Sequence, residues 1–209
     1  WVGGFYPPGT RKQDMFAHYV RHFPTVEVNY TFYRMPSPRT MERLARTAPP
    51  GYLFWVKANR SLTHEGDLAG TPAFLDALAP LAGSGRLAGV LLQFPQSFRR
   101  TVAARKFLAA ALEGLSPAPR AVEFRHRSWE HPSTAEGLRQ CGVTLVIPDV
   151  PPIAGLYRAP PALTTSTGYL RLHSRNAAKW YAGAVERYDY SYGDVELRDL
   201  VDQWSPLAE

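Results

Sequence analysis

Side chains that can transfer protons stand at the ends of short apolar runs in this chain. Two carboxylates, one ammonium group and one imidazole occupy such positions, and general acid–base catalysis uses these groups. We assign four candidate catalytic residues: Glu27, Lys57, Glu123 and His173. A further set of polar or aromatic residues at or just after the same run ends forms the candidate substrate-binding residues: Asn29, Tyr33, Arg34, His64, Gln93, Arg125, His126, Trp129, Asp149 and Arg171.

The two glutamates have two interpretations. Glu27 and Glu123 could be the acid and the base of a glycoside hydrolase, which uses a pair of carboxyl groups. A basic neighbour such as Lys57 or Arg171 would instead hold either carboxylate ionised in a salt bridge. Opposite charges inside a protein pair in this way whatever the function, because an isolated buried charge is costly. We favour the salt-bridge interpretation.

Metal binding is a separate question for the same side chains. Acids and histidines such as Glu123, Asp149 and His173 are suitable oxygen and nitrogen ligands for a divalent metal. No local spacing such as HExxH is present, and Lys57 and Arg125 would compete for the acids. We therefore assign no metal ligand and expect no cofactor, and keep a divalent metal as an alternative. The serine nucleophile motif GxSxG is also absent.

Six short runs with strand character must position these residues. They are residues 25–30, 52–58, 88–94, 120–125, 143–148 and 168–173. Helical patterns fill the gaps, with expected starts at Ser37, Thr71, Ser133 and Ser191. Strands that alternate with helices through short connections indicate a parallel sheet.

The strands distinguish a barrel from an open doubly wound sheet. Central strands of an open sheet are apolar on both faces, whereas Val122-Glu123-Phe124-Arg125 and Leu170-Arg171-Leu172-His173 alternate. One face carries charge, which suits the inside of a barrel near its C-terminal rim. No glycine-rich phosphate loop follows a strand. We predict an α/β fold, a TIM-like (β/α) barrel, as a single domain over residues 1–209.

Composition limits the class of protein. The chain has 209 residues, of which 45% are hydrophobic, and a formal net charge of +6. It is therefore no disordered tail. Its single cysteine, Cys141, excludes an internal disulfide framework. No apolar run reaches the roughly 18–20 residues of a membrane span, and residues 1–10 lack a signal pattern. We expect a cytoplasmic protein with no membrane partner.

Five blocks resemble one known family. They read TVEVNYTFYRMPSP at 25–38, FWVKANRSLTHE at 54–65, LLQFPQSF at 91–98, VEFRHRSW at 122–129 and YLRLHSR at 169–175. Each is similar to a block typical of the YecE-like proteins, also called domain of unknown function 72. The blocks cover nearly the whole chain in order, so the resemblance is specific. It implies a TIM-like (β/α) barrel of unassigned activity.

The chain departs from this family in several places. Asn59 stands where the family has a proline and Ser174 where it has a glycine, which should alter loop shape at the mouth of the barrel. The family's opening GTSGW strand is present only as its final residue, Trp1, and the closing strand is absent. We therefore expect an incomplete barrel, and a native polypeptide longer at both ends by roughly one strand each.

Three functions fit these observations. The first is a protein that binds a small polar or anionic molecule at the C-terminal mouth, as a hydrolase-type enzyme or a binding protein. The second is a nucleic-acid-binding or metal-dependent nuclease-like barrel, which the +6 charge and arginine-rich loops favour. Trp129 beside Arg125 and Arg127 suits base or sugar stacking, and equally an ordinary lid over the rim. The third is a non-catalytic scaffold in which the arginines pair with carboxylates.

Period-two alternation makes a specific structural prediction. Val122, Phe124, Leu170 and Leu172 should face the helices, together with Val26 and Val28. The ring of Glu27, Lys57, Glu123 and Arg171 then faces inward. We predict that at least one acid–base pair of this ring lies within salt-bridge reach, and that all four side chains are largely buried.

Overall fold

The computed structural model describes residues 1–207, which divide into two compact units. Unit 1 comprises residues 1–91 and 113–119. Unit 2 comprises residues 92–112 and the chain from Arg120 onward. The single domain predicted over residues 1–209 stays a prediction, and each unit is described by itself below.

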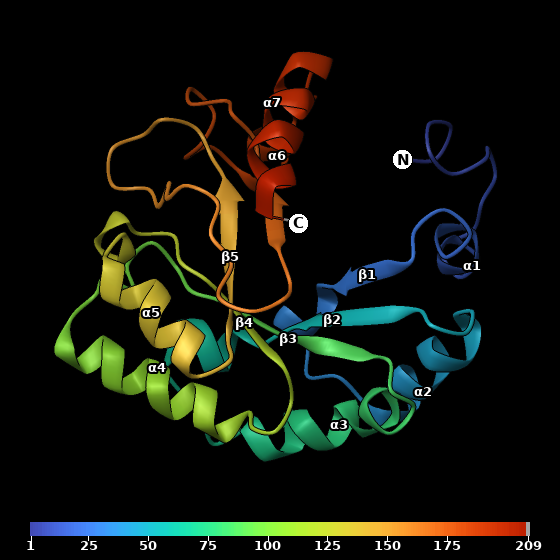
Figure 1. Cartoon of the computed structure of the whole chain (residues 1–209). Helices are drawn as coiled ribbons and strands as arrows, with labels where there is room; N and C mark the ends of the chain where they lie inside the picture. The colour runs from blue at the N-terminus through green and yellow to red at the C-terminus, as the bar shows by residue number, and fades with distance from the viewer. Residues whose placement is uncertain (208–209) are drawn as a thin grey trace. The chain divides into compact units, whose positions relative to one another are not determined.

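The described chain contains six strands: β1 (Thr25–Val28), β2 (Leu53–Lys57), β3 (Leu87–Gln93), β4 (Arg120–Glu123), β5 (Thr144–Asp149) and β6 (Tyr169–Leu172). The helices are α1 (Met15–Tyr19), α2 (Pro38–Thr47), α3 (Thr71–Gly83), α4 (Val102–Gly114), α5 (Pro132–Gln140), α6 (Ala184–Tyr188) and α7 (Asp194–Trp204). Strands β1 to β5 alternate with helices along the chain, and β5 is followed by β6 without a helix between them (Figure 1). The strand order follows the chain order, from β1 to β6. The chain is thus an incomplete α/β barrel of the TIM type, as predicted.

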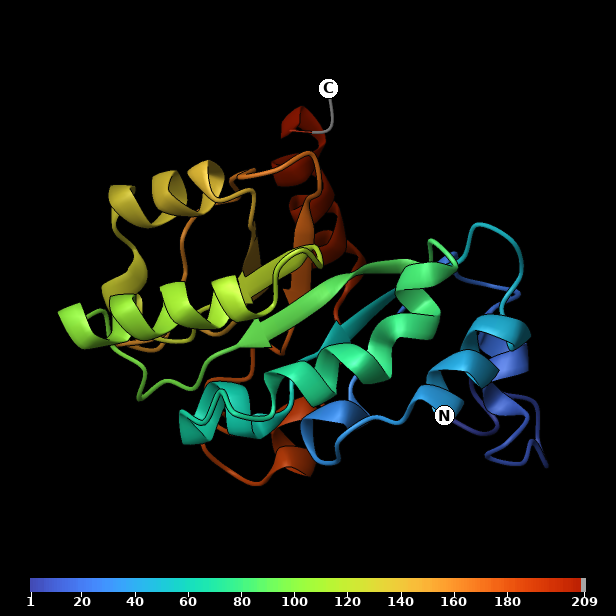
Figure 2. The ribbon, with the colours of Figure 1, turned by 90° about the horizontal axis from the view of Figure 1, so that it is seen from below.

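Unit 1 contains β1, β2 and most of β3 in a parallel arrangement. Figure 2 shows α3 along one face of these strands, with α2 beside it. The apolar residues of the strands supply the core: Phe54 and Val56 of β2 are fully buried, as is Phe74 of α3. This burial of the apolar alternate residues leaves Glu27 and Lys57 at the opposite face of their strands.

Unit 2 contains β4, β5 and β6, also parallel. Helices α4 and α5 run beside one another on the same side of β4 and β5 (Figures 1 and 2). Under them lies a stack of aromatic rings, in which the centroids of Phe124 and Trp129 are 4.2 Å apart and those of Phe94 and Phe98 are also 4.2 Å apart. This apolar layer packs Phe124, the residue that follows Glu123.

All six predicted strands are present, and each end lies within two residues of the one expected. The helix starts are less accurate. Ser37 caps α2 as predicted, its Oγ accepting from Thr40 N at 3.3 Å. The caps predicted at Thr71, Ser133 and Ser191 are wrong, because those helices are preceded by the residues Gly70, His131 and Gly193. Proline at the first position sets the start of α5 at Pro132, ahead of Ser133.

The predicted alternation holds for β4 and only in part for β6. Val122 and Phe124 are fully buried. Leu172, predicted to face the helices, is 43% exposed instead. β6 pairs with β5 and stands last in the strand order, so Leu172 lacks the cover that a further neighbouring strand would give. Within residues 1–207, no helix is both long enough and apolar enough to cross a membrane.

Candidate functional site

The predicted site residues divide between the two units. Unit 1 carries Glu27, Asn29, Tyr33, Arg34, Lys57 and His64. Unit 2 carries Gln93, Glu123, Arg125, His126, Trp129, Asp149, Arg171 and His173. Unit 2 brings four of them into direct contact, and we call Glu123, Arg125, Arg171 and His173 the Glu123 cluster.

Glu123 is the centre of this cluster and is fully buried. Its Oε2 accepts from Arg171 Nη1 at 2.5 Å, and its Oε1 forms an ion pair with Arg125 Nε. His173 Nε2 lies 3.1 Å from the same Oε1. The prediction of an acid–base pair within the ring is therefore confirmed by Glu123 and Arg171.

The strands explain why these residues meet. Glu123 ends β4 and Arg171 lies in β6, on either side of β5. In a (β/α) barrel, inward side chains from alternate strands share a layer. Arg125 and His173 lie two residues beyond these positions, so period two places them on the same face. The amide of His173 donates to the carbonyl of Asp149 at 3.0 Å, which extends the β5–β6 pairing to this residue.

The prediction that all four ring side chains are largely buried is confirmed for Glu123, which is fully buried, and for Arg171, which retains only 14% exposure of its side chain. Glu27 and Lys57 are half-buried. Long basic side chains keep part of their length accessible even when the charge is paired.

His173 contacts both charged partners of the cluster through its ring nitrogens. Arg125 Nη2 lies 3.0 Å from His173 Nε2 and 3.3 Å from Nδ1. The same Nε2 lies 3.1 Å from Glu123 Oε1. Burial, together with the charges of Arg125 and Arg171, lowers the pKa of His173 to about 4, against the opposing effect of Glu123. His173 is neutral at neutral pH.

Glu123 is charged under the same conditions. Burial on its own raises the pKa of a carboxyl group, but the charges of Arg125 and Arg171 outweigh it here. The pKa of Glu123 is held well below its usual range.

Arg125 has donor capacity that the described residues do not use. Its side chain is 10% exposed. Nε pairs with Glu123 and Nη2 with His173, while Nη1 donates to no residue in the described range 1–207. A guanidinium group has five N–H donors in a fixed plane, so two of them remain for a ligand on the accessible side.

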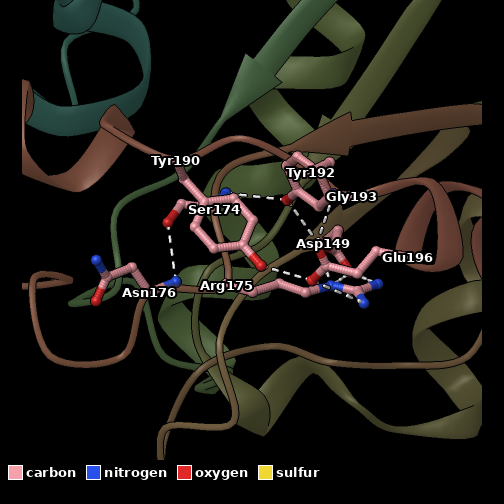
Figure 3. Close-up of polar contacts among 8 residues, drawn as sticks. All are labelled: Asp149, Ser174, Arg175, Asn176, Tyr190, Tyr192, Gly193 and Glu196. Carbon is pink, nitrogen blue, oxygen red and sulfur yellow. Dashed lines mark hydrogen bonds and ion pairs between the residues drawn. The ribbon is translucent and has the colours of Figure 1, made fainter.

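A second polar cluster lies at the end of β5 (Figure 3). Asp149 accepts from Arg175 through both carboxylate oxygens, with Nε–Oδ2 and Nη2–Oδ1 distances of 2.9 Å. Tyr192 donates its hydroxyl to Asp149 Oδ2 at 2.7 Å. Glu196 of α7 accepts from Tyr190 and lies 3.4 Å from Arg175 Nη1. We call these five residues the Asp149 cluster.

The Asp149 cluster holds the segment that follows His173. Ser174 has a φ of 119°, which is unfavourable for a residue with a side chain. Its amide donates to Tyr192 Oη at 3.1 Å, and its Oγ accepts from Asn176 N at 3.0 Å. These bonds hold Ser174 in a backbone conformation that glycine adopts more readily than other residues.

The unit 1 residues form local contacts of their own. Lys57 Nζ lies 4.4 Å from the centroid of the Phe32 ring. His64 sits in a short π-helix, Ser61–Glu65, and its Nδ1 is 2.9 Å from Thr63 Oγ1. Asn29, Tyr33 and Arg34 are exposed, Tyr33 by 79%.

Three predicted residues of unit 2 lie outside both the Glu123 cluster and the Asp149 cluster. Trp129 is 2% exposed and donates from Nε1 to the carbonyl of Phe98 at 2.7 Å, so it packs in the aromatic layer. His126 Nδ1 accepts from the amide of Ser128 at 3.1 Å. Gln93 donates from Nε2 to the carbonyl of Phe94 at 3.1 Å.

Sequence reasoning missed the residues that complete the Asp149 cluster. Arg175, Tyr192 and Glu196 come from loops and from α7, where no strand periodicity points to a common site. One signal was available, because a carboxylate at a strand end such as Asp149 requires a partner. Among the described residues, no group of three or more His, Cys, Asp and Glu side chains is arranged to hold a metal ion.

Comparison with known sequences matches the chain to one protein family. Residues 1–209 match the family model described as "Protein of unknown function DUF72". UPF0759 protein YunF of Bacillus subtilis (strain 168) is 31% identical over 225 residues, which cover 98% of this chain and 79% of YunF. UPF0759 protein YecE of Escherichia coli (strain K12) is 30% identical over 146 residues, covering 65% of this chain and 52% of YecE.

Solved structures of DUF72 family proteins also match this chain. A DUF72 family protein from Thermotoga maritima MSB8 superimposes with a TM-score of 0.90 and 35% identity, over 100% of this chain and 83% of that one. A DUF72 family protein from Enterococcus faecalis V583 has a TM-score of 0.84 and 25% identity, over 95% of this chain and 83% of that one.

Proposed function

Since the chain belongs to the DUF72 family, we propose a function for it from the Glu123 cluster: it binds a small anionic molecule there, at the C-terminal ends of β4 and β6. The C-terminal ends of the strands are where (β/α) barrels keep their sites. The anion would be a carboxylate or a phosphate, because a planar guanidinium matches the oxygens of both.

One observation carries this proposal: Arg125 is buried beside Glu123 with its Nη1 group unused by the described residues. Glu123 and His173 orient the plane of Arg125, so the remaining donors need no rearrangement when an anion arrives. Such preorganisation saves part of the cost of binding.

Hydrolase-type chemistry at the same place would use His173 as its base once a ring nitrogen is released from Arg125. Its neutral ring follows from burial and from the two arginine charges. An anion beside Arg125 would offset those charges and raise the pKa of His173 toward its ordinary value of about 6.5. The ring would then be a stronger base when the ligand is bound, which general base catalysis requires.

The test is titration calorimetry with phosphate, sulfate and acetate at constant ionic strength. We expect saturable binding of at least one anion to the wild-type protein. A hydrogen bond to a charged group contributes about 1.5–3 kcal/mol, so Arg125→Gln should weaken binding by at least about tenfold. Arg127→Gln is the matched control, since Arg127 is exposed and lies two residues away.

The melting temperature of each variant separates binding from folding. Loss of binding in a folded Arg125→Gln protein supports the proposal. Equal affinity in wild type and Arg125→Gln, or no anion bound by the wild type, refutes it. If the wild-type protein binds no anion, the Glu123 cluster is a structural ion network, and the non-catalytic scaffold is the better interpretation.

Nucleic-acid binding is a second candidate, favoured by the surroundings of His126. Burial, and then the charges of Arg99 and Arg127, lower the pKa of His126, so these cations gather at one place in unit 2. Electrostatic binding to phosphates weakens steeply with salt. Duplex or single-stranded DNA should bind at low salt and be released on raising it. An absence of binding at low salt would exclude this candidate.

We also propose the cytoplasm as the location. The support is the single, unpaired cysteine Cys141, which suits a reducing compartment. Fractionation of cells that express the native protein would test it, and recovery in another compartment would contradict it.

A further inference from the structure

Two histidines lie one helical turn apart in unit 1, outside both clusters described above. His18 belongs to α1, and His22 follows four residues later, just after this helix. The helical turn continues past α1, because the amide of Phe23 donates to the carbonyl of Tyr19 at 3.2 Å. Side chains four residues apart on such a turn are neighbours on one face. The two imidazole rings therefore lie side by side.

The separation of the His18 and His22 rings suits a shared metal ion. Their centroids are 4.6 Å apart and their planes are tilted by 41°, so the rings are not stacked face to face. A metal that binds one nitrogen of each ring at the usual distance of about 2.0–2.1 Å holds the two centroids about 4.5–5.2 Å apart, for bond angles between square and tetrahedral. The observed separation falls within this interval.

The ring nitrogens of this pair are available to a ligand. Among residues 1–207, none forms a hydrogen bond or an ion pair with a side-chain nitrogen of His18 or His22. His22 is exposed and His18 is half-buried, so an ion can reach the pair from solvent. A neutral imidazole with a free nitrogen is the commonest metal ligand in proteins.

Phe5 holds both rings in place. Its ring centroid lies 5.2 Å from that of His18 and 5.3 Å from that of His22, and both contacts are T-shaped. Aromatic rings favour this edge-to-face arrangement. Because packing against Phe5 restricts the rotation of both imidazoles, less conformational freedom is lost when they bind an ion together.

We propose that His18 and His22 together bind a divalent transition metal ion of the kind that prefers imidazole, such as Zn²⁺ or Cu²⁺. Each ring contributes one nitrogen. Among the described residues, no third His, Cys, Asp or Glu joins the pair, so water takes the remaining coordination positions. Imidazole suits these ions better than Mg²⁺, and a given site binds Cu²⁺ more tightly than Zn²⁺. This site is independent of the anion site at the Glu123 cluster.

The experiment is a titration of the whole chain with Zn²⁺ at pH 7.5, followed by the imidazole C–H resonances of its six histidines. Every protein carries Cys141→Ser, because the exposed thiol of Cys141 is itself a ligand for these ions. We expect the resonances of His18 and His22 to shift together and to saturate at one equivalent for the pair. Excess Mg²⁺ should not displace Zn²⁺. Separate titration of the two rings, or displacement by Mg²⁺, overturns the proposal.

Single substitutions test whether both rings hold the same ion. His22→Asn removes the exposed ligand, and His18→Phe removes the other while keeping a ring against Phe5. Loss of a residue that merely supports a metal ligand weakens binding by about 10–100-fold. Loss of a ligand itself should therefore weaken the calorimetric affinity for Zn²⁺ by at least about tenfold in each variant.

His131→Asn is the matched control, since His131 is an exposed histidine of unit 2 that caps α5, and asparagine also caps helices. It should bind Zn²⁺ at the pair as the unsubstituted chain does. The melting temperature without metal shows whether each variant folds, and added Zn²⁺ should raise it only where both rings are present. The proposal is overturned if folded His22→Asn or His18→Phe retains the full affinity, or if His131→Asn loses as much affinity as they do.

Discussion

Glu123 is the residue on which both the folding and the proposed binding depend. It is fully buried and contacts two guanidinium groups and one imidazole. A buried ion network contributes little net stability when intact, but removing one member leaves the others uncompensated.

The first prediction follows from this asymmetry. Glu123→Gln removes the only carboxylate of the Glu123 cluster, so the free energy of unfolding should fall by about 3–5 kcal/mol. Urea denaturation measures this value. Glu136→Gln is the control, because Glu136 pairs with Arg139 at the surface and should cost at most about 1 kcal/mol. Equal losses in the two variants would show that Glu123 is not electrostatically coupled to its neighbours.

The second prediction concerns pH and His173. Its pKa is about 4 in the folded protein and about 6.5 in an unfolded chain. Between these values the unfolded chain binds a proton that the folded protein does not, so stability falls as pH decreases. The loss is about 1.4 kcal/mol per pH unit, up to about 3 kcal/mol. Stability is fully present above pH 6.5.

The measurement is denaturation between pH 4 and pH 7.5 for wild type and His173→Gln. Glutamine keeps a donor for Glu123 but does not titrate, so the wild-type protein should lose stability more steeply over the interval from 6.5 to 4. Parallel curves for the two proteins would mean that His173 is not held neutral by burial and the arginine charges.

At the scale of elements, two glycines have opposite surroundings. A Cβ at Gly89 in β3 would collide with the Trp55 ring and would lie 2.8 Å from the carbonyl oxygen of Pro119. A Cβ at Gly137 in α5 would meet nothing within 4 Å. The strand therefore needs glycine for a close approach, and the helix does not.

Alanine substitutions test this difference. Gly89→Ala should destabilise the protein by about 1–3 kcal/mol through overpacking. Gly137→Ala should stabilise it by up to about 1 kcal/mol, because alanine has the higher helix propensity. Thermal melting of both variants gives the comparison. Changes of the same sign would contradict the described packing around at least one of these elements.

The strands were predictable and the helix starts were not, for a physical reason. Alternation in segments such as Val122-Glu123-Phe124-Arg125 reports which face of a strand is buried, and no other register keeps Glu123 away from the helices. Several residue types can cap a helix, so Ser133 and Ser191 looked as suitable as the observed His131 and Gly193. The prediction that Leu172 faces the helices was wrong, because burial in the last strand of a sheet depends on neighbours outside that strand.

At the scale of the whole molecule, the sequence predicted the class of fold. Of the two polar clusters in unit 2, it predicted the residues of the Glu123 cluster. The Glu123 cluster was accessible because all its residues lie at strand ends, which parallel strands bring to one edge. The Asp149 cluster was not, since Tyr192 reaches Asp149 from a loop and Glu196 reaches Arg175 from α7. Chain segments that return to a site from far along the sequence leave no periodic pattern of residues that would predict the contact.

The most direct test of the proposed function is to locate an anion by crystallography. Crystals of this chain soaked in selenate would reveal the anion by its anomalous scattering. We expect a selenate oxygen within hydrogen-bond distance of Arg125 Nη1 in the wild-type protein, and no such site in Arg125→Gln. Selenate found only at exposed arginines such as Arg99 and Arg127, with none at Arg125, would contradict an anion site in the Glu123 cluster.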